Sequence, residues 1–277
     1  MGRREPTALV ALKPAEIAKS RLATFPDPLR QRLAWTMALD TLSALSHALP
    51  HVLVVSDQPA LEARLRHAGI AAEVISESGH VGMNSALSQG ARTLHMQGFS
   101  SVLACVGDLP ALRPESVLRI LDASQSHPRS FVADASGVGT TMLVAHDVEL
   151  APQFQGRSAA AHYASGAVNL SADAIGSPIA DARRDVDNEA DLGVAIGLGV
   201  GPATGSLIDH GKGRLGRYQL ITATQWRNAE GELLAVTATG RRIALPAEAL
   251  RDELRYIRLG QRLHAVEADG RVLSAWL

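Results

Sequence analysis

Short apolar runs and longer amphipathic segments alternate along the first two hundred residues. Continuous apolar runs predict buried strands at 7–13, 51–57, 72–77, 101–108, 130–135 and 140–146. Helical periodicity predicts helices at 27–49, 59–69, 83–98, 113–124 and 159–165. Strands that are apolar on both faces need helices on both sides, so this alternation predicts an α/β fold with a mostly parallel sheet. Such sheets carry their sites at the carboxyl ends of the strands.

The pattern changes near residue 198. Residues 198–213 contain five glycines and a proline without periodicity, so we predict a linker there. Beyond it, short β-branched or alternating segments separated by glycine-containing turns predict a small all-β module, with one helical connection over 247–258. The predicted organisation is a first domain over 1–198, a linker over 199–213 and a small β-barrel over 214–277.

Composition and charge narrow the classes of function. The net charge is −1 and aromatic residues make up 4% of the chain, so neither charge nor stacking side chains favour nucleic acid as a partner. No apolar run approaches the roughly 18 residues of a membrane span, so we expect no membrane partner. Cys105 is the single cysteine, which excludes an internal disulfide and fits a reducing, cytoplasmic compartment.

Two of the chain's three lysines, Lys13 and Lys19, lie within seven residues of each other, after the first predicted strand. The other 24 of the 27 basic residues are arginines, and Arg21 follows in the same loop. Three cations on this loop suit a polyphosphate. A solvated basic loop is the alternative, but the scarcity of lysine elsewhere favours binding. The chain has no GxxxxGK[ST] or GxGxxG motif, so P-loop and dinucleotide-binding interpretations lack their fingerprint.

Aspartates mark two further candidate positions. Asp108 ends an apolar strand, and a carboxylate at such a strand tip can hold Mg²⁺. A turn-forming role for Asp108 is the alternative. Asp185 and Asp187 lie in "RRDVDNEADL", where we predict a strand that places them on opposite faces, followed by a helix that Asn188 caps. One of the two would then join Asp108 on a metal ion.

Amide and hydroxyl side chains lie near predicted helix starts and glycine-bearing loops. Asn84 and Ser85 begin the third predicted helix, where they can cap it or contact a nucleobase. Thr140 follows a glycine at the start of a strand, and Ser158 begins a short helix, a position that suits an anion. His162 lies one helical turn after Ser158 on the same face. Plain capping is the alternative for each of these residues.

Five motifs together carry a family resemblance. In chain order over residues 7–197 they are "LKPAEIAKSRLA", "GMNSAL", "GDLPAL", "GTTMLVA" and "RRDVDNEADL". They resemble the 2-phospho-L-lactate guanylyltransferase family, whose members also use phosphoenolpyruvate or 3-phosphoglycerate in the biosynthesis of coenzyme F-420. The resemblance implies an α/β domain similar to nucleotide-diphospho-sugar transferases, GTP as a substrate and Mg²⁺ as a cofactor. The C-terminal module lies outside the resemblance and looks similar to an OB or cold-shock barrel.

The resemblance also implies roles for individual residues. Asp108 and Asp187 would hold Mg²⁺, and Lys13, Lys19 and Arg21 would bind the phosphates of GTP. Asn84 and Ser85 would lie near the nucleoside. The acid substrate would be bound by Thr140, Gln155 and Ser158. Lys13, Lys19 and Asp108 are the expected catalytic residues. Gln155 and Arg157 stand where small residues are usual, which bears on the identity of the acid, and the resemblance is compatible with a homodimer.

Two other functions stay open. The first is a nucleotidyltransferase of the same fold that acts on a sugar phosphate or a molybdopterin, which a panel of nucleotides and acceptors would separate. The second is a regulatory or nucleic-acid-binding protein that acts through its C-terminal barrel. Loss of metal binding at Asp108 together with salt-dependent RNA affinity would favour this second function.

Overall fold

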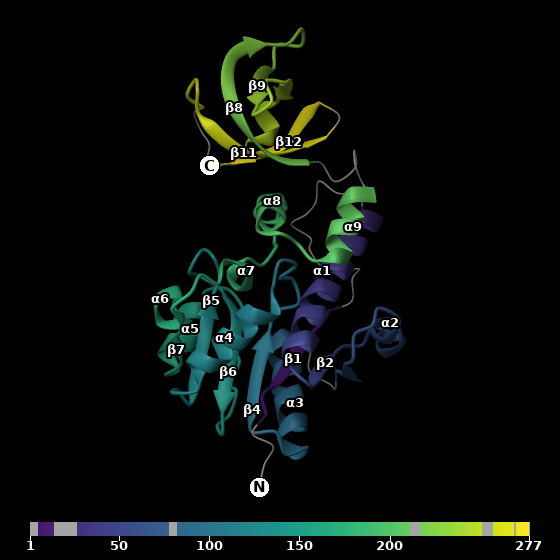
Figure 1. Cartoon of the computed structure of the whole chain (residues 1–277), viewed down its shortest axis with the longest axis vertical. Helices are drawn as coiled ribbons and strands as arrows, with labels where there is room; N and C mark the ends of the chain where they lie inside the picture. Colours follow the sequence, from purple (N-terminus) through teal and green to yellow (C-terminus); the bar gives the residue numbers. More distant parts are fainter. Residues whose placement is uncertain are drawn as a thin grey trace.

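The molecule combines an α/β part, built on a seven-stranded sheet, with a closed five-stranded barrel (Figure 1). The seven-stranded sheet and the barrel follow one another along the long axis (Figure 1). Both parts of the predicted fold class are therefore confirmed. This computed structural model describes residues 5–13, 27–77, 82–210, 217–250, 257–268 and 270–276.

The sheet has the strand order β3-β2-β1-β4-β6-β5-β7, and β6 is the one antiparallel strand of the seven. Because β6 runs against its neighbours, it begins at the edge where β1 and β4 end. We call this the carboxyl edge, and we call the opposite edge, where β1 and β4 begin, the amino edge. The strands are β1 Thr7–Ala11, β2 Val52–Val55, β3 Glu73–Ile75, β4 Ser101–Cys105, β5 Arg129–Ala133, β6 Thr140–His146 and β7 Val168–Asn169.

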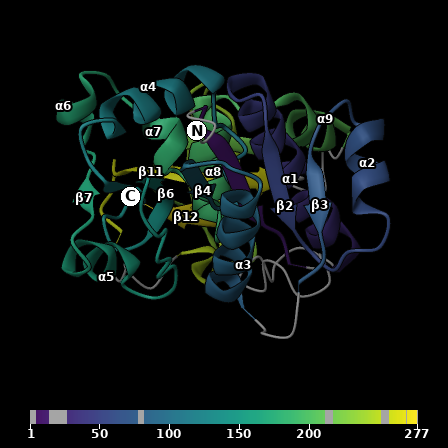
Figure 2. The same cartoon turned by 90° about the horizontal axis from the view of Figure 1, so that it is seen from below.

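Helices cover both faces of the sheet, as predicted. Val10 packs in a core with α1, α2 and α4, whereas its neighbour Leu9 packs in a second core with α3 and α5. Figure 2 shows α3 and α5 on one side of the sheet and α4 on the other. The helices are α1 Asp27–Ala48, α2 Leu61–His67, α3 Met83–Met96, α4 Pro114–Ser124, α5 Ser158–Ala164, α6 Ala172–Ile175, α7 Ala180–Arg183, α8 Glu189–Leu198 and α9 Pro202–His210.

One glycine sets how closely α3 approaches β1. A Cβ atom at Gly90 would lie 2.4 Å from Cδ1 of Leu9, a distance that no packed side chain tolerates. The bare backbone at this position therefore lets α3 lie directly on the sheet. This contact also holds the first turn of α3 near the carboxyl edge.

The C-terminal strands close in the order β10-β12-β11-β8-β9 around a core of small and aliphatic side chains. The strands are β8 Arg217–Arg227, β9 Leu233–Thr237, β10 Arg242–Leu245, β11 Arg262–Ala268 and β12 Arg271–Trp276. The predicted helical connection over 247–258 is seen only as a 3-10 turn at Ala247–Ala249, since 251–256 lie outside the described residues. Helix α8 contacts β8, β11 and β12, so it joins the barrel to the α/β part.

The predicted linker differs from the structure. Residues Pro202–His210 form helix α9, which packs on α1. Asp40 of α1 caps this helix, because its carboxylate accepts the backbone N–H groups of Ala203 at 2.9 Å and Thr204 at 2.8 Å. Burial raises the pKa of Asp40, against these hydrogen bonds. The capping residue lies more than 160 positions away along the chain, so the local sequence carries no signal for it.

Across the part of the chain that the structure describes, no single helix is long and apolar enough to cross a membrane. Helices α8 and α9 satisfy the criteria of length and composition only as a pair, and that pair is bent by 117°.

Candidate active site

Lys13 lies at the carboxyl edge, immediately beyond β1. Leu12 holds this end of the strand against β2, since its N–H donates to the carbonyl of Val55 at 3.0 Å and its carbonyl accepts from the Ser56 hydroxyl at 2.8 Å. The carbonyl of Lys13 accepts from the side-chain amide of Gln58 at 2.9 Å, while the Lys13 side chain is exposed. The backbone is therefore fixed, and the ammonium group can reach an anion. Lys19 and Arg21 lie outside the described residues.

The tip of β4 brings Asp108 next to the segment that carries Asp187. The Asp108 carbonyl accepts the N–H of Val186 at 3.1 Å, and Val186 is fully buried. Asp108 is half-buried with its Oδ1 atom covered, and Asp187 is half-buried. A Cβ atom at Gly107 would lie 2.5 Å from Leu12, so glycine allows the tip of β4 to lie against the end of β1. The two aspartates, 79 positions apart, thus reach the same place.

The segment with Asp185 and Asp187 is not the strand that we predicted. It runs without regular structure between α7 and α8, and the N–H of Asp187 donates to Asp191 at 3.3 Å. The prediction that the two aspartates face opposite ways was also unsound, because residues two apart on a strand share a face. The predicted cap is confirmed, since the Asn188 side chain accepts the N–H of Asp191 at 3.0 Å. Capping α8 here requires the chain to turn, which ends any strand.

Both arginines of the "RRDVD" motif hold the structure around this segment. The guanidinium of Arg183 donates to the carbonyl of Asp134 at 2.7 Å, which fixes the turn between β5 and β6. Arg184 forms an ion pair with Asp191 at 3.1 Å. Burial raises the pKa of Asp191, although this ion pair opposes the shift. The motif therefore positions the loop that carries Asp187.

Asn84 and Ser85 lie in the first turn of α3, as predicted. The Asn84 side-chain oxygen accepts the N–H of Phe154 at 2.7 Å. It thereby links α3 to the loop between β6 and α5, and Ser85 is half-buried beside it in the same turn. Residues 78–81, which precede this turn, lie outside the described part of the chain.

Thr140 and Ser158 are buried near each other, at the start of β6 and the start of α5. The turn before Thr140 meets α5 through a hydrogen bond from the N–H of Ala159 to the carbonyl of Val138, at 3.1 Å. The Thr140 hydroxyl lies 3.0 Å from Nδ1 of His162, on the next turn of α5. Gln155, which the resemblance implied as a substrate ligand, is exposed on the preceding loop.

His162 is an uncharged histidine in a nonpolar setting. It is fully buried, with the edge of one phenylalanine ring, Phe154, at 5.2 Å and a tilted ring, Phe131, at 5.8 Å. Burial, assisted by the positive charge of Arg129, lowers the pKa of His162 to about 4. Cys105 is also buried, and burial together with the charge of Asp108 raises the pKa of its thiol.

A threonine that the sequence analysis overlooked supports the turn after β4. The hydroxyl of Thr41 accepts the N–H of Leu109 at 2.9 Å and donates to the carbonyl of Met37 at 2.9 Å. Thr41 is fully buried on α1. A hydroxyl on the apolar face of a predicted core helix was the signal that could have identified it.

The side chains at the carboxyl edge that suit a divalent cation are carboxylates. Within the described residues, no cluster of three or more His, Cys, Asp or Glu side chains forms a metal site. Asp108 and Asp187 therefore offer two carboxylates, which suits an ion that takes its other ligands from water and from substrate phosphates, as Mg²⁺ does.

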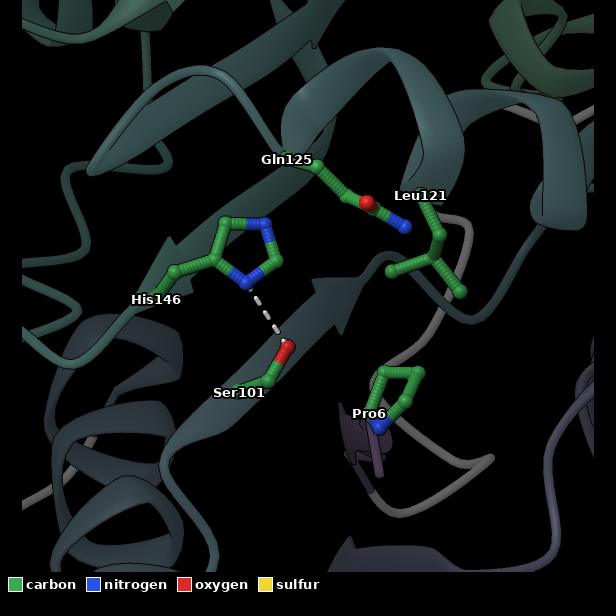
Figure 3. A pocket seen from close by; sticks show the side chains of 5 residues that line it. All are labelled: Pro6, Ser101, Leu121, Gln125 and His146. Carbon is green, nitrogen blue, oxygen red and sulfur yellow. Dashed lines mark hydrogen bonds between the residues drawn. The ribbon is translucent and has the colours of Figure 1, made fainter. Parts of the chain in front are cut away.

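A hollow of roughly 260 Å³ lies at the amino edge, away from all these residues (Figure 3). Its lining residues come from the start of β4, the end of β6, the last turn of α4 and the segment before β1. They are Pro6, Ser101, Leu121, Gln125 and His146. The hollow contains no charged carboxylate or ammonium group, so it lacks the chemistry that a nucleotide needs.

Comparison with known proteins agrees with this arrangement. Residues 28–172 match the MobA-like NTP transferase domain. A phosphoenolpyruvate guanylyltransferase from Streptomyces coelicolor is 43% identical over 206 residues, which cover 73% of this chain and 94% of that protein. Another from Mycolicibacterium smegmatis is 37% identical over 202 residues, which cover 72% of this chain and 89% of that protein.

The fold also has a counterpart among solved structures. A protein from Desulfovibrio desulfuricans, described as a nucleotide-diphospho-sugar transferase, superposes with a TM-score of 0.57 at 13% identity, covering 77% of this chain and 97% of that one. This structural similarity shows the fold alone, whereas the sequence matches show the family. Together they identify the chain as a nucleotidyltransferase that belongs to the phosphoenolpyruvate guanylyltransferase family.

Proposed function

We propose that this protein transfers GMP from GTP to the phosphate of a three-carbon phospho-acid. A phosphate oxygen of the acid attacks the α-phosphorus of GTP and forms a new P–O bond. The bond from that phosphorus to the oxygen bridging the α- and β-phosphates breaks, and pyrophosphate leaves. Phosphoenolpyruvate is the first candidate acid because the relatives named above carry it in their names. 2-Phospho-L-lactate and 3-phosphoglycerate are the others, in a step of coenzyme F-420 biosynthesis.

The observation that carries the proposal is the convergence of unlike groups at the carboxyl edge. A lysine, two aspartates and two buried hydroxyl groups come together there from distant parts of the chain. They are Lys13, Asp108, Asp187, Thr140 and Ser158. Cations suit the phosphates of GTP, carboxylates suit a divalent ion, and hydroxyl groups suit an acceptor such as a carboxylate.

Each group has a place in the proposed reaction. Lys13, together with Lys19 and Arg21, binds the phosphates of GTP and stabilises the charge that develops on pyrophosphate. Asp108 and Asp187 would hold Mg²⁺, which neutralises phosphate charge when it is bound. The remaining residues orient the substrates, with Asn84 and Ser85 near the nucleoside and with Thr140, Ser158 and Gln155 near the acid. Orientation matters because phosphoryl-type transfers depend mainly on positioning and charge.

The experiment is a measurement of pyrophosphate release by the full chain with GTP and Mg²⁺. Phosphoenolpyruvate, 2-phospho-L-lactate and 3-phosphoglycerate are offered separately, and the product is weighed by mass spectrometry. We expect release with at least one acid and a product that contains GMP and that acid. ATP in place of GTP tests the choice of base. If the protein binds GTP but releases no pyrophosphate with any of the three acids, the proposal is refuted, and sugar phosphates and molybdopterin are the next acceptors to test.

A further inference from the structure

The hydrogen bonds around His162 determine which of its nitrogens carries the hydrogen. Nε2 lies 2.9 Å from the backbone nitrogen of Gln153. A backbone N–H can only donate, so Nε2 must accept and must be unprotonated. A neutral imidazole then carries its hydrogen on Nδ1, which faces the Thr140 hydroxyl oxygen 3.0 Å away and also the backbone carbonyl of Ser158.

This assignment decides what the Thr140 hydroxyl can do. Because Nδ1 carries a hydrogen, it cannot accept one from Thr140, so the hydrogen of the Thr140 hydroxyl is available for a different acceptor. The neighbouring Thr141 shows the opposite case, since its hydroxyl donates to the carbonyl of Ala182 at 2.7 Å. Among the described residues, His162 is the partner that the structure gives the Thr140 side chain. A buried donor in that position favours an acceptor supplied by a ligand.

The imidazole is also held against rotation. Phe154 meets it edge-on, and the N–H of Phe154 is itself bound by Asn84 at 2.7 Å. Two consecutive backbone N–H groups of one loop, those of Gln153 and Phe154, are therefore fixed to α5 and to α3. This loop therefore fixes the position of the Thr140 hydroxyl relative to the start of α3.

We infer that His162 is a positioning residue, which directs the Thr140 hydroxyl hydrogen toward the carboxylate of the phospho-acid. The inference rests on the proposed function and deepens it. His162 itself touches neither substrate nor reacting atoms. It acts by fixing the direction of one hydrogen bond, and a carboxylate, which only accepts hydrogen bonds, is the ligand group that matches a fixed donor.

Two substitutions separate the two nitrogens of the ring. In His162→Gln the amide oxygen can replace Nε2 as the acceptor for Gln153, but nothing donates to Thr140. In His162→Asn the amide nitrogen can still donate to Thr140, but the acceptor for Gln153 is lost. We expect His162→Gln to raise the KM for the acid about tenfold without changing the KM for GTP. His162→Asn should keep the KM for the acid within about threefold of the parent and lower the melting temperature.

A double-mutant cycle with Thr140→Val tests whether His162 acts through Thr140. Thr140→Val alone should raise the KM for the acid about tenfold or more. Adding His162→Gln to Thr140→Val should then cause no further rise, because the hydroxyl that His162 directs is gone. Penalties that multiply would overturn the inference, as would equal rises in the KM values for the acid and for GTP in His162→Gln.

A readout in the free protein does not depend on turnover. Long-range proton–nitrogen NMR correlations of the histidine rings, assigned by their loss in His162→Gln, should show Nδ1 protonated and Nε2 bare at pH 7. A hydrogen on Nε2 would overturn the inference. A parent enzyme that turns over no phospho-acid would instead refute the proposed function, and normal turnover without coupling in the cycle would refute the inference alone.

Discussion

The two edges of the sheet each hold a histidine bound to hydroxyl groups, yet their networks end differently. At the amino edge, the Ser124 hydroxyl donates to the carbonyl of Leu121 at 2.7 Å, so it accepts from Nε2 of His146 at 2.8 Å. Ser101 then donates to Nδ1 of His146 at 2.9 Å, the bond drawn in Figure 3. The hydroxyl hydrogens of Ser101 and Ser124 and the ring N–H of His146 are therefore all donated within the protein. At the carboxyl edge, the backbone N–H of Gln153 reverses the order and leaves the Thr140 hydrogen for a ligand.

The comparison teaches that residue types alone do not mark a site. Burial lowers the pKa of both His146 and His162, and both bind a hydroxyl group on a strand of the same sheet. What separates them is the partner of the second nitrogen, which is a hydroxyl in one case and a backbone N–H in the other. If the carboxyl edge carries the chemistry, substitutions there should affect turnover, whereas substitutions at the amino edge should affect only stability.

The largest expected effect is on Asp108. We expect Asp108→Asn to lower kcat by about 1,000-fold or more, because it removes a carboxylate charge that we propose to hold Mg²⁺ at the carboxyl edge. The unfolding free energy should change little, since the tip of β4 is held by the backbone bond from Val186. Pyrophosphate release and urea unfolding measure the two quantities. Turnover that survives with ordinary Mg²⁺ dependence would show that Asp108 does not hold the metal.

The next effect is the pH dependence of stability that His162 causes. Its pKa is lowered to about 4, so between pH 6.5 and 4 the unfolded chain binds a proton that the folded chain refuses. The contribution of neutral His162 to the free energy of unfolding is therefore fully present above pH 6.5. It is lost as the pH falls toward 4, and the total loss is about 3 kcal/mol. Urea unfolding should show that the parent loses unfolding free energy relative to His162→Gln as the pH falls from 6.5 to 4. A difference that stays constant with pH contradicts the shifted pKa.

A smaller effect is expected at the amino edge. His146→Phe should cost about 2 kcal/mol of unfolding free energy, because the hydroxyl groups of Ser101 and Ser124 lose their shared partner. kcat and both KM values should stay within about twofold of the parent at 25 °C. His146→Gln, which retains an amide donor, is the matched control and should cost less. A fall in kcat without a fall in stability would end the distinction between the two edges.

The smallest effect on chemistry is expected from removal of residues 214–277. Helix α8 contacts the barrel, so removal of the barrel should expose apolar surface on α8 and lower solubility. We expect kcat to change by less than about threefold. Pyrophosphate release and sedimentation measure the two outcomes. A folded but inactive shortened chain would show that the barrel completes the carboxyl edge.

The barrel also allows a test of the nucleic-acid alternative. Trp226 is 44% exposed on its surface, but the guanidinium of Arg242 lies over the ring at 4.2 Å. An RNA binding assay across salt concentrations would detect any stacking role for this pair.

Local patterns were enough to predict most of the elements. Continuous apolar strands such as β2 and β4, and the Asn188 cap of α8, are properties of a few adjacent residues. The parallel arrangement also made it possible to expect Lys13 and Asp108 at one edge, because strand ends in such a sheet coincide. Lys19 and Arg21 lie outside the described residues, so their placement stays a prediction.

Distant partners account for what the sequence analysis missed. The capping of α9 by Asp40 and the support of Leu109 by Thr41 join positions far apart in the chain. The pairing of Thr140 with His162 depends on how a strand and a helix meet, which no spacing rule describes. The order of hydrogen bonds at His162 depends further on a backbone N–H, a group that every residue except proline carries and that leaves no trace in the sequence.

The cap on α9 has a consequence for how this chain can be divided or recombined. Asp40 is 5% exposed and is bound by two N–H groups of α9. A catalytic unit cut at residue 198 would leave this buried carboxylate facing a vacated groove on α1, and it would expose Leu33 and Met37, which pack with Leu207. A fragment that keeps residues up to 210 retains its own last helix. Any exchange of C-terminal modules between proteins of this kind would therefore conserve the first unit intact only if the crossover falls after α9.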